Sequence, residues 1–230
     1  MIDNSGQFGA YNVDICLCID KTASMGPIID TVKRNALNLY RDVLDSLEKK
    51  NKRVNQFRIR VIWFGDYLAD SVPILVSDFL KMPEELSTYE EFVKSVNPKG
   101  GGDAPEDGLE ALTYAIRSDW VKSGWKKRHI IALFTDAPTH ELGFGKAAQS
   151  YPKQGMPDDF GQLSEMWGNK TFPGEMDNSS KRLLLFAPDT SFWNTIKECW
   201  NNVVLSPAGE STGLEDIAYQ YMINTIVNSV

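Results

Sequence analysis

Apolar residues along this chain follow two spacings that alternate from one segment to the next. Nearly continuous apolar runs predict buried strands, because strands of a parallel sheet are covered on both faces. Apolar residues that recur every three or four positions predict helices with one buried face. The predicted strands cover residues 13–19, 57–64, 74–76, 129–134, 182–187 and 202–205. The predicted helices cover residues 28–47, 87–96, 109–116, 158–167, 191–200 and 214–227.

This order of elements predicts an α/β fold, namely a three-layer, doubly wound, Rossmann-like domain. The expected sheet has six strands, is mainly parallel and carries helices on both faces. The strand at 74–76 follows a turn too short for a crossover helix, so it is predicted to be an antiparallel edge strand. Residues 1–230 are expected to form a single domain, with an elaborated loop at about residues 140–181.

The composition excludes several classes of protein. The chain has 230 residues, of which 42% are hydrophobic, so it is expected to fold rather than remain disordered. Its net charge is −7 and it has no long basic tract, so nucleic acid is not an expected partner. Its first residues do not form a basic segment followed by an apolar one, and nowhere do about 18 apolar residues follow one another. We therefore expect a cytoplasmic protein that does not bind membranes.

Oxygen-bearing side chains collect where the predicted strands end. The carboxyl ends of parallel strands line one cleft. Alternation in the pattern Asp-x-Thr-x-Ser after the first strand can direct one carboxylate and two hydroxyls to a single point. An acidic Gly-rich loop and the end of the fourth strand add further carboxylates, which gives the candidate ligands Asp20, Thr22, Ser24, Asp103, Glu106 and Asp136. Such oxygens suit a hard divalent cation, so the sequence predicts Mg²⁺ or Mn²⁺.

Helix capping is the alternative explanation for each of these acidic residues taken singly. Capping alone does not explain the whole combination in this order. Asp66, at the end of the second strand, is expected either to support the metal ligands or to cap its own turn. His140 is expected to be a solvated loop residue rather than a ligand, because hard cations prefer oxygen.

These residues resemble the metal-ion-dependent adhesion site of von Willebrand factor type A (VWA) domains. That site opens with Asp-x-Ser-x-Ser after the first strand, and residues 19–25 here read IDKTASM, in which Thr22 replaces the first Ser. The family's Asp after the fourth strand matches Asp136 in LFTDAPTH. The loop from Asp103 to Glu106 is similar to the Asp-x-Pro-Glu of integrin β-subunit domains, which implies Glu106 as the middle ligand and Asp103 as its substitute. The motifs GGGDAPE and TDAPTH look closest to bacterial intracellular members of the family.

The resemblance also implies what the site does. In the family, the metal keeps one coordination position open, and an Asp or Glu of a partner protein fills it. The implied function is therefore metal-dependent protein binding without catalysis.

The segment DKTAS offers an enzymatic alternative, because it is similar to the DKTGT of P-type ATPases in the haloacid-dehalogenase-like superfamily. This resemblance implies a phosphohydrolase with Asp20 as nucleophile and Mg²⁺ at Asp103 and Asp107. Soluble phosphatases of this type need a second Asp two residues after the nucleophile, and this chain has Thr22 there. Their acidic loop also follows an apolar strand, whereas residues 93–102 are polar and Gly-rich. The binding module is therefore favoured.

Overall fold

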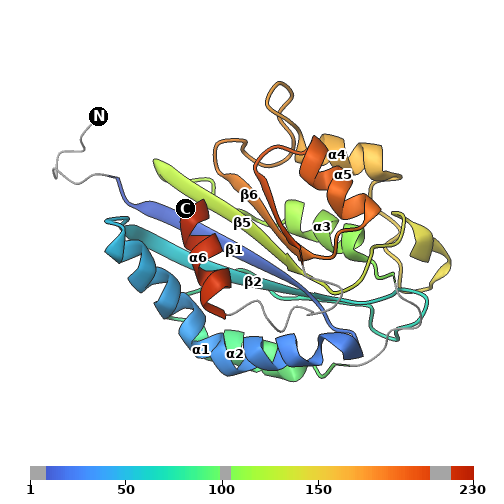
Figure 1. The fold of residues 1–230 in the computed structure, drawn as a ribbon, viewed down its shortest axis with the longest axis horizontal. Helices are drawn as coiled ribbons and strands as arrows, with labels where there is room; N and C mark the ends of the chain where they lie inside the picture. The colour runs from blue at the N-terminus through green and yellow to red at the C-terminus, as the bar shows by residue number, and fades with distance from the viewer. Residues whose placement is uncertain (1–8, 99–104, 208–218) are drawn as a thin grey trace.

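The computed structural model describes residues 9–98, 105–207 and 219–230, and Figure 1 shows their arrangement. The strands are β1 (Tyr11–Asp20), β2 (Val54–Phe64), β3 (Ile74–Val76), β4 (Leu80–Lys81), β5 (Lys126–Phe134), β6 (Lys181–Ala187) and β7 (Val203–Pro207). The α-helices are α1 (Gly26–Lys49), α2 (Leu86–Ser95), α3 (Gly108–Ile116), α4 (Phe160–Trp167), α5 (Ser191–Cys199) and α6 (Tyr219–Ser229). Two short 3₁₀ helices, η1 (Ala23–Met25) and η2 (Phe144–Ala147), follow β1 and β5.

The strands form one sheet in the order β3-β2-β1-β5-β6-β7. Neighbours from β2 to β7 are parallel, while β3 pairs antiparallel with β2 at the edge. The predicted fold class is therefore confirmed. The two-residue strand β4, which is too short to give a sequence pattern, also pairs antiparallel with β2.

Apolar side chains fill the space on both faces of the sheet. Helices α1, α2 and α6 cover one face of the sheet, and α3, α4 and α5 cover the other (Figure 1). One apolar cluster lies between the sheet and the first set of helices, and a second lies between the sheet and the other set. Alternate residues of β1 point into opposite clusters, which explains its nearly continuous apolar sequence. Ile15 and Leu17 belong to the first cluster, whereas Cys16 and Cys18 belong to the second as buried free thiols.

The segment at 140–181, predicted as an elaborated loop, is packed against the rest of the domain. It contains η2 and the predicted helix, which is α4. Leu163 and Trp167 of α4 are fully buried in the second cluster. The indole of Trp167 also donates to the backbone carbonyl of Asn201 at 3.0 Å. This segment therefore contributes to the core.

Among the described residues, no helix combines the length and the apolar character that a membrane crossing requires.

Candidate metal centre

A chain of hydrogen bonds joins four of the six candidate ligands at the carboxyl edge of the sheet. Asp20 Oδ1 accepts from the backbone N–H of Thr22 at 2.9 Å and from its hydroxyl at 2.6 Å. The Thr22 hydroxyl lies 3.3 Å from the Ser24 hydroxyl, and Ser24 donates to Asp136 Oδ1 at 3.1 Å. Side chains from the first and fourth predicted strand ends therefore meet, as the sequence predicted.

The parallel pairing of β1 with β5 brings these strand ends together. Ile19 lies opposite Phe134 in the register, so Asp20 and Thr135 leave the sheet side by side. Thr135 donates its hydroxyl to Asp20 Oδ2 at 2.7 Å. Both carboxylate oxygens of Asp20 are thus fixed in a fully buried position.

Burial raises the pKa of Asp20 to about 6. Hydrogen bonds from Thr22 and Thr135 lower this pKa, and the nearby charge of Asp136 raises it further. The site therefore stabilises the carboxylate form only in part, and a neighbouring positive charge would favour it.

Glu106 brings another carboxylate to the same edge. Its side chain is 2% exposed, and its Oε2 accepts no hydrogen bond from the residues that the structure describes. Burial raises its pKa to about 9, and the charges of Asp20 and Asp66 add to this effect. A buried carboxylate oxygen without a partner is costly, and a cation would supply that partner.

The donor set of this site fits a hard divalent cation. Its members offer only carboxylate and hydroxyl oxygens, and Glu106 provides an oxygen that has no hydrogen-bond partner among the described residues. Mg²⁺ and Mn²⁺ both bind such oxygens. The remaining candidate, Asp103, lies outside the described residues.

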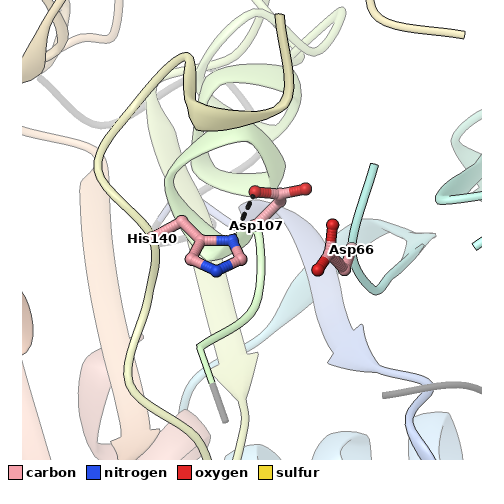
Figure 2. Close-up of side chains that lie close together, drawn as sticks. All are labelled: Asp66, Asp107 and His140. Atoms are coloured by element: carbon pink, nitrogen blue, oxygen red, sulfur yellow. Dashed lines mark hydrogen bonds and ion pairs between the residues drawn. The ribbon is translucent and has the colours of Figure 1, made fainter. Parts of the chain in front are cut away.

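A second group of titratable side chains lies close together, as Figure 2 shows. Asp66, Asp107 and His140 each place one oxygen or nitrogen within 4.8 Å of the others. Asp107 Oδ1 pairs with Nδ1 of His140 at 3.2 Å, and Asp107 Oδ2 accepts from the backbone N–H of Tyr67 at 2.6 Å. These contacts join the loop after β5 and the loop after β2 to the start of α3.

Two expectations about this group are resolved by the structure. His140 is 6% exposed, so the expectation of a solvated loop residue is wrong. Its ring is covered by Phe144, with ring centroids 4.1 Å apart. Asp66 accepts from the backbone N–H groups of Leu68 and Ala69 at 2.5 and 3.3 Å, so it caps its own turn.

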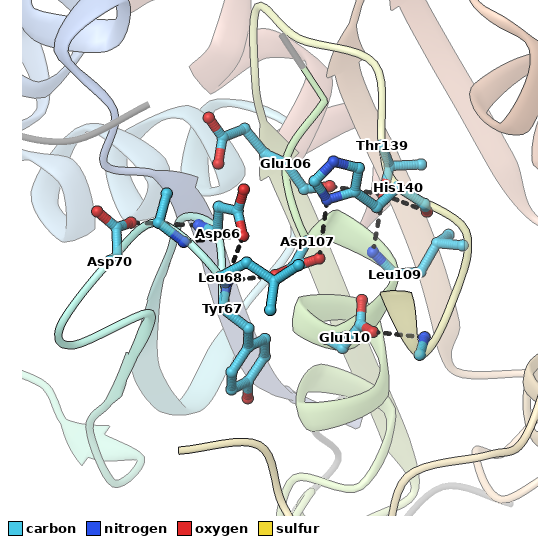
Figure 3. A network of polar contacts seen from close by, with 12 residues as sticks. Asp66, Tyr67, Leu68, Asp70, Glu106, Asp107, Leu109, Glu110, Thr139 and His140 are labelled. Atoms are coloured by element: carbon cyan, nitrogen blue, oxygen red, sulfur yellow. Dashed lines mark hydrogen bonds and ion pairs between the residues drawn. The ribbon is translucent and has the colours of Figure 1, made fainter. Parts of the chain in front are cut away.

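The backbone of Glu106 is held by the loop that follows Asp136 (Figure 3). Its N–H donates to Pro138 O at 3.0 Å, and its carbonyl accepts from the N–H of His140 at 2.9 Å. Thr139 adds a hydroxyl donor to the same carbonyl at 3.0 Å. This short pairing, which the sequence did not reveal, sets the position of the Glu106 side chain relative to Asp136.

An ion pair joins the loops after β1 and β2. Lys21 Nζ lies 2.7 Å from Asp70 Oδ2, and both side chains are largely buried. The backbone N–H of Lys21 also donates to Phe64 O at 2.8 Å. Lys21 thus compensates one carboxylate of this acidic edge and leaves the others to the candidate centre.

Comparison with known proteins identifies the family. A family model described as von Willebrand factor A domain matches residues 14–150, which is more than half of the chain. The chain belongs to the von Willebrand factor A domain family. The matched segment runs from β1 past η2, so it includes the described candidate ligands and the His140 group.

Two curated relatives share this segment at low identity. The chain is 24% identical over 140 residues to Alpha-protein kinase vwkA of Dictyostelium discoideum. The aligned segment makes up 61% of this chain and 21% of the kinase. It is 27% identical over 128 residues to the putative ariadne-like RING finger protein R811 of Acanthamoeba polyphaga mimivirus. That aligned segment makes up 56% of this chain and 11% of the viral protein. The matched region thus spans about a fifth or less of each relative.

Solved structures share the whole fold. The match with the pilus adhesin SpaC of Lactobacillus rhamnosus GG has a TM-score of 0.57 at 12% identity. It covers 97% of this chain and 32% of the SpaC chain. The match with a von Willebrand factor type A protein of Catenulispora acidiphila has a TM-score of 0.55 at 14% identity. It covers 96% of this chain and 43% of the Catenulispora chain. These matches show a VWA fold across the chain.

Proposed function

We propose that this VWA domain is a metal-ion-dependent protein-binding module. A Mg²⁺ or Mn²⁺ ion is held by residues from three loops at the carboxyl edge of the sheet. The protein ligands in this proposal are Asp20, Thr22, Ser24, Asp136 and a middle residue, which is Glu106 or its substitute Asp103. The observation that carries the proposal is the hydrogen-bonded chain from Asp20 to Asp136 beside a buried oxygen of Glu106 that no described residue pairs with.

The bound ion supplies a positive centre with one open position for a carboxylate of a partner protein. The surrounding residues keep that position ready. Thr135 and the backbone of Thr22 hold the Asp20 carboxylate, while the pairing with Thr139 fixes the backbone of Glu106. An acidic partner residue approaching this edge without the ion meets several carboxylates and is repelled.

The arrangement supports binding rather than catalysis. A phosphohydrolase with Asp20 as nucleophile needs a general acid two residues later. The residue there is Thr22, whose hydroxyl donates to Asp20 itself at 2.6 Å. We therefore propose a non-enzymatic domain.

The kinase and the putative RING finger protein match this chain over a small part of their length. In our proposal, the domain is a recognition unit whose partner is a protein that presents an Asp or Glu. Buried free thiols at Cys16 and Cys18 suit a reducing compartment, so the proposal places the domain in the cytoplasm.

Thermal unfolding with and without the ion tests this function. Ligand binding to the folded state raises the melting temperature, so millimolar Mg²⁺ should stabilise the wild type relative to EDTA. Asp136→Ala should remove this difference while still unfolding cooperatively. The same protein should release no phosphate from generic phosphoesters in Mg²⁺. Equal melting in Mg²⁺ and EDTA, or phosphate release that Asp20→Asn abolishes, would contradict the proposal.

A further inference from the structure

Two large apolar side chains are exposed beside the candidate metal centre. Leu68, in the turn after β2, is 50% exposed, and Phe144, in η2, is 51% exposed. The two segments are in contact, because a Cβ added to Gly145 would lie 2.5 Å from Cβ of Tyr67. We call Leu68 and Phe144 the apolar ledge.

The ledge is fixed by hydrogen bonds beneath it. The N–H of Leu68 donates to Asp66, and that of Tyr67 donates to Asp107. On the other side, Phe144 packs against the ring of His140 at a tilt, and His140 pairs with the same Asp107. Figure 3 shows Leu68 lying over the backbone beside Asp66 and Asp107. A fixed apolar surface loses little conformational entropy when a partner covers it.

Backbone contacts connect the ledge to the candidate centre. Asp107, which follows Glu106, accepts from the N–H of Tyr67, the residue before Leu68, at 2.6 Å. The Lys21–Asp70 ion pair connects the same turn to the loop that carries Thr22. A short segment bound at the metal would therefore pass close to the ledge.

The charges around this edge limit what the partner can be. Asp66 is buried and Asp70 is paired with Lys21, so neither carboxylate faces a partner. The exposed charges beside Phe144 are those of Glu141 and Lys146, which have opposite signs. They favour neither a strongly acidic nor a strongly basic segment next to the residue on the ion. The remaining favourable contact is burial of apolar surface on Leu68 and Phe144.

We propose that the apolar ledge is the second half of the binding surface. Its occupant is a segment of a partner protein that places one Asp or Glu on the ion and a nearby Leu, Ile, Met or Phe on the ledge. This proposal rests on the proposed metal-dependent function and adds to it the sequence character of the partner.

Selection from a displayed library of random peptides in Mg²⁺ tests the pairing. Peptides enriched on the wild-type domain should share an acidic residue and an apolar residue at a fixed short spacing. In a synthetic version of an enriched peptide, replacing the apolar residue with Ser should weaken binding about tenfold. Leu68→Ser and Phe144→Ser should each weaken the original peptide by a similar factor. Trp125→Ser is the matched control. Trp125 is 82% exposed and lies just before the first residue of β5, whereas the candidate centre lies after the last residue of that strand.

The Mg²⁺-dependent melting shift separates the two proposals. If the wild type and both ledge variants keep that shift, the ion site is intact and the ledge alone is under test. Enriched peptides with an acidic residue but no apolar one, equal affinity of wild type and ledge variants, or no enrichment at all would then overturn the ledge proposal. Absence of the shift in the wild type would instead overturn the proposed function.

Discussion

Asp107 is the residue at which three loops meet. It accepts from the backbone of Tyr67 and pairs with the ring of His140. Burial raises the pKa of Asp107, and these two hydrogen bonds lower it. We therefore expect Asp107 and His140 to position the neighbouring Glu106.

Replacing His140 with Ala should remove the ring that pairs with Asp107. We expect the free energy of unfolding to fall by about 1–3 kcal/mol, because the buried carboxyl group of Asp107 loses a hydrogen-bond partner. Mg²⁺ affinity should fall about tenfold or more, as is typical when residues behind a metal site are lost. Urea denaturation and Mg²⁺ titration measure the two effects. His140→Asn, which keeps a nearby N–H donor, should recover part of both losses, and an Ala variant with wild-type Mg²⁺ affinity would show no positioning role.

Glu110 is a buried carboxylate away from the proposed ligands, and it predicts a pH effect. Its Oε1 accepts from the N–H of Gly143 at 2.8 Å and the hydroxyl of Tyr151 at 3.2 Å. Burial raises its pKa from 4.5 to about 7. Between these values the folded state holds a proton that the unfolded state has lost, so this group makes stability fall as pH rises.

Glu110→Gln keeps an oxygen acceptor for Gly143 and Tyr151 but cannot ionise. In EDTA, the wild type should therefore lose more stability than the variant between about pH 4.5 and 7. Above that range, the difference between the two proteins should become constant. Melting temperatures across pH measure this, and parallel profiles would contradict the assigned role of Glu110.

The sequence predicted some site residues well and others poorly, and the reason is physical. Asp20, Thr22 and Ser24 lie within one turn, so their convergence could be deduced from local spacing. The pairing of Asp107 with His140 depends on how three loops pack, and neither residue has a local pattern that reveals it. An Asp just before a predicted helix and a His shortly after Asp136 were the only signals, and both have common alternative explanations.

At the scale of elements, the start of α3 is set by its close approach to α5. A Cβ at Gly108 would lie 2.7 Å from the Trp193 ring, closer than real contacts allow. The Trp193 indole also donates to Ala137 O at 3.1 Å, so α5 supports the loop after Asp136. Gly108 is thus the residue that lets α3, α5 and this loop pack together.

Gly108→Ala should lower the free energy of unfolding by about 1–3 kcal/mol, because the added methyl overpacks the contact with Trp193. Gly9→Ala is the matched control, since the φ angle of Gly9 lies outside the left-handed region and the nearest atom to its added Cβ, in Trp125, would be 3.7 Å away. That control should be neutral or slightly stabilising. Urea denaturation of both variants checks this, and equal stabilities would contradict the proposed close packing.

Strand identity and direction could be predicted because apolar runs and connection lengths determine them locally. The contribution of α4 to the core could not, because residues 140–181 are rich in Gly, Pro, Asn and Asp. That composition is typical of a surface loop, and the burial of Trp167 depends on contacts with Asn201, far along the chain.

At the scale of the whole molecule, the parallel sheet gathers acidic loops from distant parts of the chain at one edge. The chain as a whole carries a net charge of −7, so an acidic partner gains nothing from long-range attraction. A bound cation reverses this locally. The domain should therefore recognise an acidic partner only when its ion is present.

Titration of Mn²⁺ into the protein, followed by calorimetry, tests the central claim most directly. The wild type should bind one ion per chain, and Asp20→Asn should bind it at least about tenfold more weakly. Asp30→Asn, which removes an exposed carboxylate from α1, should bind like the wild type. No Mn²⁺ binding to the wild type at millimolar concentrations, or the same affinity in the wild type and Asp20→Asn, would contradict the account.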